Sequence, residues 1–253
     1  MSFKEWLFSL YPNPHIDGQY GLLHIITMVF IAALVVVSTL LLKKKSEKTK
    51  RIFLCILAAI ILTFEIARRV INFCKGSDFT VNSVLHILLP RPGCAISCWL
   101  VILAVIINKK FFYNFASIIS IICAAIFFAY PGVGFNNEYI LFENLYSIIT
   151  HSLFFAVSIC FITLNFTDFK YKDAWKELIC LAVMIIYVWF ESQILKIEAD
   201  PFYCLPGNDI QEIVSLAYGA FITIYLIFVT LYFNLFYLIG DRKNVFKKRF
   251  KKK

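Results

Sequence analysis

Long runs of apolar residues alternate with short polar and charged segments along most of this chain. Seven of these runs approach or reach the roughly 20 residues that an α-helix needs to cross a bilayer. They predict membrane-spanning helices at residues 21–42, 52–73, 94–107, 111–130, 144–166, 174–195 and 214–239. The pattern therefore predicts an all-α polytopic membrane protein with seven transmembrane helices.

The third run is short and is preceded by a break. Apolar residues 84–89 lead into Pro-Arg-Pro-Gly at residues 90–93, so they can form the first half of a broken span. Proline fits the first position of a helix but cannot continue one from within, which predicts a helix start near Pro92 with Cys94 in its first turn. Non-helical backbone at membrane depth is tolerated only inside protein or beside a wet cavity. The break before Cys94 is thus a candidate site, although a plain turn beside a small buried cysteine fits the same letters.

Lysines and arginines predict the orientation of the spans, because basic loops stay on the cytoplasmic side. Most of the 25 basic residues fall in residues 43–51, 109–110, 170–176 and 241–253. We therefore expect the N-terminus outside the cell and the C-terminus in the cytoplasm. The expected location is the plasma membrane. The corresponding segments are an outer or interfacial segment (1–20), a membrane domain (21–240) and a basic cytoplasmic tail (241–253).

Composition supports the membrane class and narrows the partners. Sixty per cent of the 253 residues are hydrophobic and only 16% are charged, more apolar surface than a soluble domain of this size can bury. The net charge of +9 follows from the orientation, so we expect no nucleic-acid partner. No dinucleotide, phosphate-loop or zinc motif occurs, and we expect neither a cofactor nor a metal. Cys74 and Cys204 lie in predicted outer loops, where pairing stays an open alternative.

Five predicted spans each place an ionisable or thiol group at one level of the membrane. These groups, all in the outer half of the predicted topology, are His24, Glu65, Cys94, His151 and Glu191. Ionisable residues within spans are rare and usually face the protein interior or a water path. A cavity shared by the five side chains is therefore expected.

Glu65 has a second interpretation. Arg68 and Arg69 follow it at the three- and four-residue spacing that brings side chains together on one helix face. The trio can pair within its own helix end, or Glu65 can line the cavity.

A cysteine beside a histidine can perform acyl transfer, with the thiolate as nucleophile and the imidazole as general base. Burial in hydrocarbon disfavours the thiolate, and a helix dipole worth up to about 2 kcal/mol does not offset full burial. Cys94 therefore needs either a hydrogen-bonded histidine or a wet cavity. Our candidate for the base is His151, with His24 or Glu65 orienting it. Supporting positions are Ser97, on the helix face of Cys94, and Glu191.

Leu89-Pro90-x-x-x-Cys94-x-x-Ser97 resembles the Leu-Pro-x-x-x-Cys-x-x-Ser segment of the YwaF family of bacterial integral membrane proteins. That family is similar to a eukaryotic family of transmembrane phospholipid acyltransferases that act through a cysteine. Further matching positions, in the same order along the chain, are Gly21-Leu22-Leu23-His24, Glu65, Pro131 and His151. The resemblance implies an acyl-enzyme at Cys94 with His151 as its acid and base.

Two departures from the family bear on the choice of substrate. Gln193-Ile194 stands where the family favours Asn-Tyr, and residues 91–93 read Arg-Pro-Gly where the family often has Leu-His-Leu. His86 can stand in for the histidine that the second departure removes.

These observations predict a membrane-embedded acyltransferase or lipid hydrolase that acts on the acyl chains of phospholipids. A small-solute transporter or ligand-binding membrane protein that uses the same outer-half cavity is the alternative.

Overall fold

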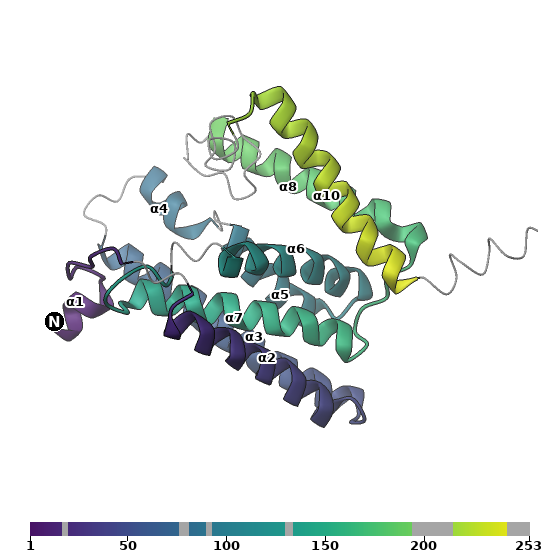
Figure 1. Cartoon of the computed structure of the whole chain (residues 1–253), viewed down its shortest axis with the longest axis horizontal. Helices are drawn as coiled ribbons and strands as arrows, with labels where there is room; N and C mark the ends of the chain where they lie inside the picture. The colour runs from purple at the N-terminus through teal and green to yellow at the C-terminus, as the bar shows by residue number, and fades with distance from the viewer. Residues whose placement is uncertain (17–19, 76–80, 90–92, 130–133, 194–214, 242–253) are drawn as a thin grey trace, which may run out of the picture. The chain divides into compact units, whose positions relative to one another are not determined.

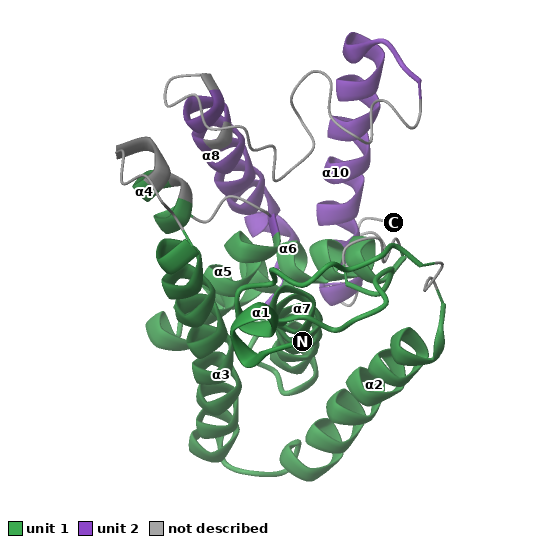
Figure 2. Cartoon of the chain, turned by 90° about the vertical axis from the view of Figure 1, so that its left-hand side faces the viewer, with its two compact units in different colours: residues 1–90, 94–167 green, residues 91–93, 168–253 purple. Residues whose placement is uncertain are grey.

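The computed structural model describes residues 1–16, 20–75, 81–89, 93–129, 134–193 and 215–241, and the described secondary structure is helical (Figure 1). The chain forms two compact units, Met1–Pro90 with Cys94–Thr167, and Arg91–Gly93 with Asp168–Lys253 (Figure 2). The helices of the first unit are α1 (Phe3–Leu7), α2 (Leu22–Leu42), α3 (Glu47–Lys75), α4 (Val81–Leu88), α5 (Gly93–Ile107, in this unit from Cys94), α6 (Lys110–Ala129) and α7 (Phe142–Thr163). Those of the second unit are the 3-10 turn η1 (Tyr171–Asp173), α8 (Ala174–Gln193) and α10 (Tyr218–Gly240).

Helix α7 is the centre of the first unit and contacts α1, α2, α3 and α6. Helices α6 and α7 both carry small buried residues, including Ala116, Ser117, Ala156 and Ser158. Small side chains let two helices approach closely, as is common inside membranes. The Ser117 hydroxyl also donates to the carbonyl oxygens of Tyr113 (2.7 Å) and Ser158 (3.3 Å), which satisfies a polar group within the interface.

Four described helices are long and apolar enough to cross a membrane: α2, α6, α7 and α10. The predicted multi-pass membrane class is therefore confirmed at the level of several candidate spans, while the seven-span count and the orientation stay predictions. Helix α5 is apolar but has only 15 residues, and α3 has 29 residues with charged residues at both of its ends.

The predicted break in the third run is present as two helices. Helix α4 ends at Leu88 and α5 begins at Gly93, which puts Cys94 in the first turn of α5. Residues 90–92, which include both prolines of the break, lie outside the described residues.

Helix boundaries differ from the apolar runs where polar residues shape the ends. Helix α3 begins at Glu47 rather than at residue 52, and the hydroxyl of Ser46 accepts a hydrogen bond from the backbone N–H of Thr49 (3.2 Å). A serine at this position satisfies an otherwise unpaired helical N–H group. Helix α7 ends at Thr163, before Asn165, whose φ of 67° is left-handed and stops the helix short of residue 166.

The predicted outer segment packs against the loop before α7. The indole N–H of Trp6 donates to the carbonyl of Ile140 (2.9 Å), and the backbone N–H of Glu138 donates to the carbonyl of Pro14 (3.1 Å). Asn13 bonds the backbone of Tyr139 in both directions. These bonds hold residues 1–16 over the start of α7.

In the second unit α8 pairs with α10 through a buried carboxylate. The Tyr237 hydroxyl donates to Glu177 Oε1 (2.6 Å), and both side chains are buried. Phe169 stacks edge-on against Tyr237 beside this bond. Cys74 is a free thiol, and Cys204, its predicted alternative partner, lies outside the described residues.

Candidate functional site

Glu65 is fully buried and is surrounded by charged and polar partners. Arg69 on the next turn of α3 binds it through Nη1, and Arg68 Nη2 lies 3.6 Å from Glu65 Oε2. From α7, the hydroxyl of Tyr146 donates to Glu65 Oε1. Glu65 therefore pairs with Arg68 and Arg69 within its own helix, which is one of the two interpretations that the sequence allowed.

Both arginines have further partners outside α3. The guanidinium of Arg69 lies over the ring of Trp99 on α5, 5.3 Å from its centroid, and its Nε is 3.4 Å from the carbonyl oxygen of Leu88 at the end of α4. Arg68 lies over the ring of Tyr146, at 5.1 Å. The network therefore joins α3, α4, α5 and α7 at one level of the first unit.

Cys94 lies beside this network. Its side chain is partly exposed and packs against the hydrophobic core. Arg68, Glu65 and Cys123 are all close enough to interact electrostatically with the thiol, and the backbone N–H of Ala95 is directed at the sulfur. That N–H belongs to the first turn of α5, where such groups have no partner within the helix.

The face of α5 that carries Cys94 also carries the buried residues Ser97 and Cys98. Ser97 bonds the thiol of Cys123 on α6. Cys98, one turn after Cys94, interacts with Glu65 and both arginines. Ser97, predicted as a supporting residue, thus bonds α5 to α6 three residues after Cys94.

His151 is buried in α7 and has one defined hydrogen bond. Its Nδ1 lies 2.6 Å from the carbonyl oxygen of Ser147, which can only accept, so Nδ1 carries the proton. In the neutral ring Nε2 then holds the lone pair that a general base needs. Phe127 on α6 stacks on the imidazole with 3.7 Å between centroids.

His24 lies at the other side of the same aromatic cluster. Its ring is 4.7 Å from Phe135 and 6.3 Å from Phe128, and both of these rings contact Phe127. The two ring nitrogens of His24 are buried and have no hydrogen-bond partner among the described residues. His24 and His151 are therefore connected through phenylalanine rings and not through a hydrogen bond between them.

Cys94 and His151 are linked through one face of α6. Cys123 interacts with Cys94, and Phe127, four residues later, stacks on His151. Residues four apart on a helix lie about 5–6 Å from each other on the same face. The described contacts of the His151 ring are with Ser147, Phe127 and Phe154. The predicted nucleophile on α5 and the predicted base on α7 thus contact residues one turn apart on α6, and the described residues show no direct bond between them.

Glu191 belongs to the second unit and is described there by itself. It is buried and accepts a hydrogen bond from the hydroxyl of Tyr187 (2.6 Å), one turn earlier in α8. The other four predicted groups all belong to the first unit, where they form two pairs. Glu65 lies near Cys94, and His24 and His151 contact the same cluster of phenylalanine rings.

Two important members of the site had no signal in the sequence analysis. Tyr146 and Phe127 both lie within apolar runs, and only their contacts with Glu65 and His151 single them out. A partner for Glu65 could have been sought among tyrosines one or two turns from His151. Among the described residues, no three His, Cys, Asp or Glu side chains are placed to share a metal ion.

The arrangement places a thiol, the backbone N–H of Ala95 and the Arg68 guanidinium next to one another at the start of a helix. Positive groups at such a position stabilise both a thiolate and the oxyanion of a tetrahedral intermediate. Nucleophilic acyl chemistry is within the reach of this site.

Comparison with known proteins gives one match. The family model of the TMEM164 family matches residues 19–240, which cover both units of the chain. No curated protein and no solved structure matches it.

Proposed function

The chain belongs to the TMEM164 family of transmembrane proteins, and we propose that it is a membrane-embedded acyltransferase or lipid hydrolase. Cys94 carries the acyl group as a thioester, and His151 transfers the protons. The substrate is a phospholipid or another acyl lipid. The enzyme has seven spans in the plasma membrane, with Cys94 in the outer half.

One observation carries the proposal. The Cys94 sulfur stands in the first turn of α5, partly exposed, with the Ala95 N–H directed at it and Arg68 within electrostatic range. A cysteine that serves only as apolar filler needs neither group. Both favour negative charge at sulfur, whereas burial and the nearby Glu65 carboxylate oppose it.

The protonation state of His151 supports its role as base. With the proton fixed on Nδ1 by the Ser147 carbonyl, Nε2 can accept a proton from the thiol. A catalytic hydrogen bond often tightens only when substrate is bound, so the proposal requires the Cys94 and His151 side chains to approach each other in the substrate complex.

The reaction has two steps. The Cys94 thiol loses its proton to His151, its sulfur attacks the ester carbonyl, and the C–O bond of the lipid breaks. The departing alkoxide takes the proton back from His151 and leaves as a lysolipid. An acceptor hydroxyl or water then loses its proton to His151 and attacks the thioester, which breaks the C–S bond and returns the proton to sulfur.

The test is to trap the thioester. Purified protein is incubated with a phospholipid that carries an alkyne acyl chain, and the label is checked for release by neutral hydroxylamine. We expect hydroxylamine-sensitive label on wild type and none on Cys94→Ser. Cys74→Ser, which removes an exposed thiol at the end of α3, is the control and should label like wild type.

A chase with unlabelled lysolipid distinguishes an intermediate from a stable acyl modification. The label should leave wild type during the chase and should form at least about 100-fold more slowly on His151→Gln. Equal labelling of wild type and Cys94→Ser would overturn the proposal. Solute uptake into proteoliposomes that is lost in Glu65→Gln and kept in Cys94→Ala would favour the transporter alternative.

A further inference from the structure

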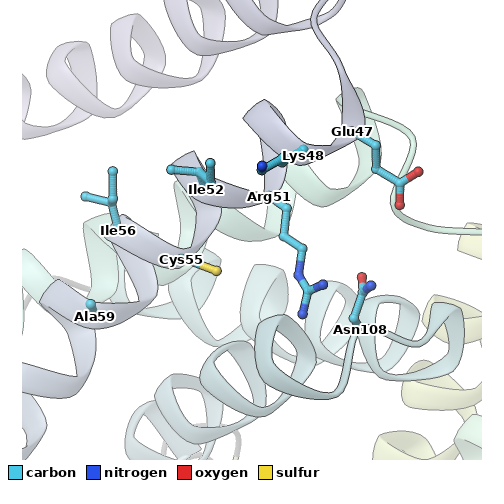
Figure 3. Close-up of a pocket in the computed structure, with 8 residues that line it drawn as sticks. All are labelled: Glu47, Lys48, Arg51, Ile52, Cys55, Ile56, Ala59 and Asn108. Carbon is cyan, nitrogen blue, oxygen red and sulfur yellow. The ribbon is translucent and has the colours of Figure 1, made fainter.

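A pocket of about 590 Å³ lies at the beginning of α3, beside the end of α5. Its polar side is formed by two cations, one amide and one carboxylate, which are Lys48, Arg51, Asn108 and Glu47 (Figure 3). Its apolar side is formed by Ile52, Ile56 and Ala59. Arg51 and Glu65 are 14 residues apart on α3, about 21 Å along the helix. The pocket is therefore separate from the candidate site at Cys94.

The polar side is prepared to donate hydrogen bonds. The Arg51 guanidinium points toward Asn108 (Figure 3). Asn108 closes α5 with a left-handed φ of 53°, and its Oδ1 accepts from the Tyr113 hydroxyl (2.9 Å). Its amide nitrogen is thereby left to donate, next to a planar guanidinium that matches the geometry of a phosphate.

The positive charge at this pocket exceeds what the chain neutralises. Glu47 stands four residues before Arg51, the spacing of an ion pair, yet among the described residues it forms none with Lys50 or Arg51. Lys43, Lys44 and Lys45 precede the pocket in the sequence and add to the excess. A negatively charged ligand fits this charge distribution.

The apolar side points to a lipid. Ile52 and Ile56 are 52% and 55% exposed and lie one turn apart, so they extend the pocket wall along the outside of α3. A small inorganic anion has no use for this wall, whereas an acyl chain buries it at about 25 cal/mol per Å².

We propose that this pocket binds an anionic phospholipid, with its phosphate at Arg51, Lys48 and Asn108 and an acyl chain along Ile52 and Ile56. In the topology proposed above the lipid belongs to the cytoplasmic leaflet, opposite the acyl-transfer site. The binding does not depend on chemistry at Cys94.

Ligand-induced thermal stabilisation of the full-length protein in detergent tests the proposal, with phosphatidylglycerol and phosphatidylcholine of identical chains as probes. Phosphatidylglycerol should raise the unfolding temperature more strongly. At 150 mM salt, Arg51→Gln should weaken its apparent affinity about tenfold or more, as for the loss of a charged hydrogen bond. Lys44→Gln also removes one positive charge, but outside the pocket. It should lower the apparent affinity for phosphatidylglycerol by less than about threefold, because exposed charges are screened.

Two further variants follow the geometry of the site. Arg51→Lys keeps the charge but not the planar fork and should lie between wild type and Arg51→Gln. Ile56→Ser should weaken the apparent affinity for phosphatidylglycerol. Inorganic phosphate should not stabilise the protein, with or without this substitution. A stabilisation by inorganic phosphate equal to that by phosphatidylglycerol would show that no acyl chain is bound.

Alkylation of Cys55 gives a readout that does not depend on unfolding. Cys55 lines the pocket, whereas Cys74 is an exposed thiol at the far end of the same helix. Phosphatidylglycerol should slow maleimide modification of Cys55 and leave Cys74 unchanged, as measured by peptide mass spectrometry. Equal protection by both lipids, or none, would overturn the proposal.

Discussion

The two ends of α3 carry the same charge pattern and use it differently. Glu47-x-x-Lys50-Arg51 and Glu65-x-x-Arg68-Arg69 place two cations three and four residues after a glutamate. Glu65 is fully buried and binds both of its arginines, whereas among the described residues Glu47 forms no ion pair with either of its cations. Spacing on a helix permits an ion pair but does not by itself produce one.

The surroundings explain the difference. At the Glu65 end, Tyr146 and Trp99 from other helices enclose the charges, and a buried carboxylate without a partner costs several kcal/mol. At the Glu47 end the charges stand in water or at a lipid surface, where an i,i+4 pair gains only about 0.3–0.5 kcal/mol. Burial thus makes pairing obligatory at one end and leaves Arg51 available to a ligand at the other.

Removal of the two glutamate charges should break this comparison most directly. Glu65→Gln leaves Arg68 and Arg69 without a counter-ion inside the bundle, and we expect it to lower the free energy of unfolding by about 3–5 kcal/mol. Glu47→Gln is the matched control and should change it by less than about 0.5 kcal/mol. Equilibrium unfolding in mixed detergent micelles measures both, and equal losses would show that the two ends are alike.

The sequence predicted the elements of this comparison but not their environments. The apolar runs predicted the helices to within a few residues, and the proline break predicted Cys94 in the first turn of α5. The three-and-four spacing gave the Glu65 pairs as one of two interpretations, and the structure shows these pairs. The same spacing occurs at Glu47, and spacing alone cannot distinguish the two ends because it contains no information about burial.

Tyr146 illustrates what was out of reach. It is 81 residues from Glu65 and is one of 13 tyrosines, with no local feature that marks it as the partner. The rings between His24 and His151 are likewise three among 27 phenylalanines. In a chain this apolar, hydrophobicity identifies the helices but not which ring faces which polar group.

Removal of the Tyr146 hydroxyl measures how much α7 contributes to the stability of the Glu65 network. Tyr146→Phe removes the hydroxyl that donates to Glu65 Oε1 and should cost about 1.5–3 kcal/mol, the range for hydrogen bonds to charged groups. Tyr171→Phe, at an exposed tyrosine of η1, should cost less than about 0.5 kcal/mol. Tyr146→Phe combined with Glu65→Gln should lose less than the sum of the single variants, since both remove one interaction.

The contribution of α5 should be smaller and concerns an aromatic ring. Trp99→Leu removes the ring under Arg69, and we expect a loss of about 2 kcal/mol for a partly desolvated cation–π contact. Trp175→Leu is the control, because Lys176 lies 6.0 Å from the centroid of this exposed ring. It should cost at most about 0.5 kcal/mol, and a similar loss in both variants would mean that the enclosure by Trp99 adds nothing to the pairing of Arg69.

The smallest expected effect is the coupling between Glu47 and Arg51. A double-mutant cycle with Glu47→Gln and Arg51→Gln should give a coupling energy below about 0.5 kcal/mol, which added salt reduces further. The corresponding cycle with Glu65→Gln and Arg69→Gln should give about 1–3 kcal/mol, because its partners are desolvated. The first value also bears on the lipid pocket. If Glu47 and Arg51 were strongly coupled, the guanidinium would already be neutralised within the helix, and an anionic phospholipid would have to break that pair before it could bind.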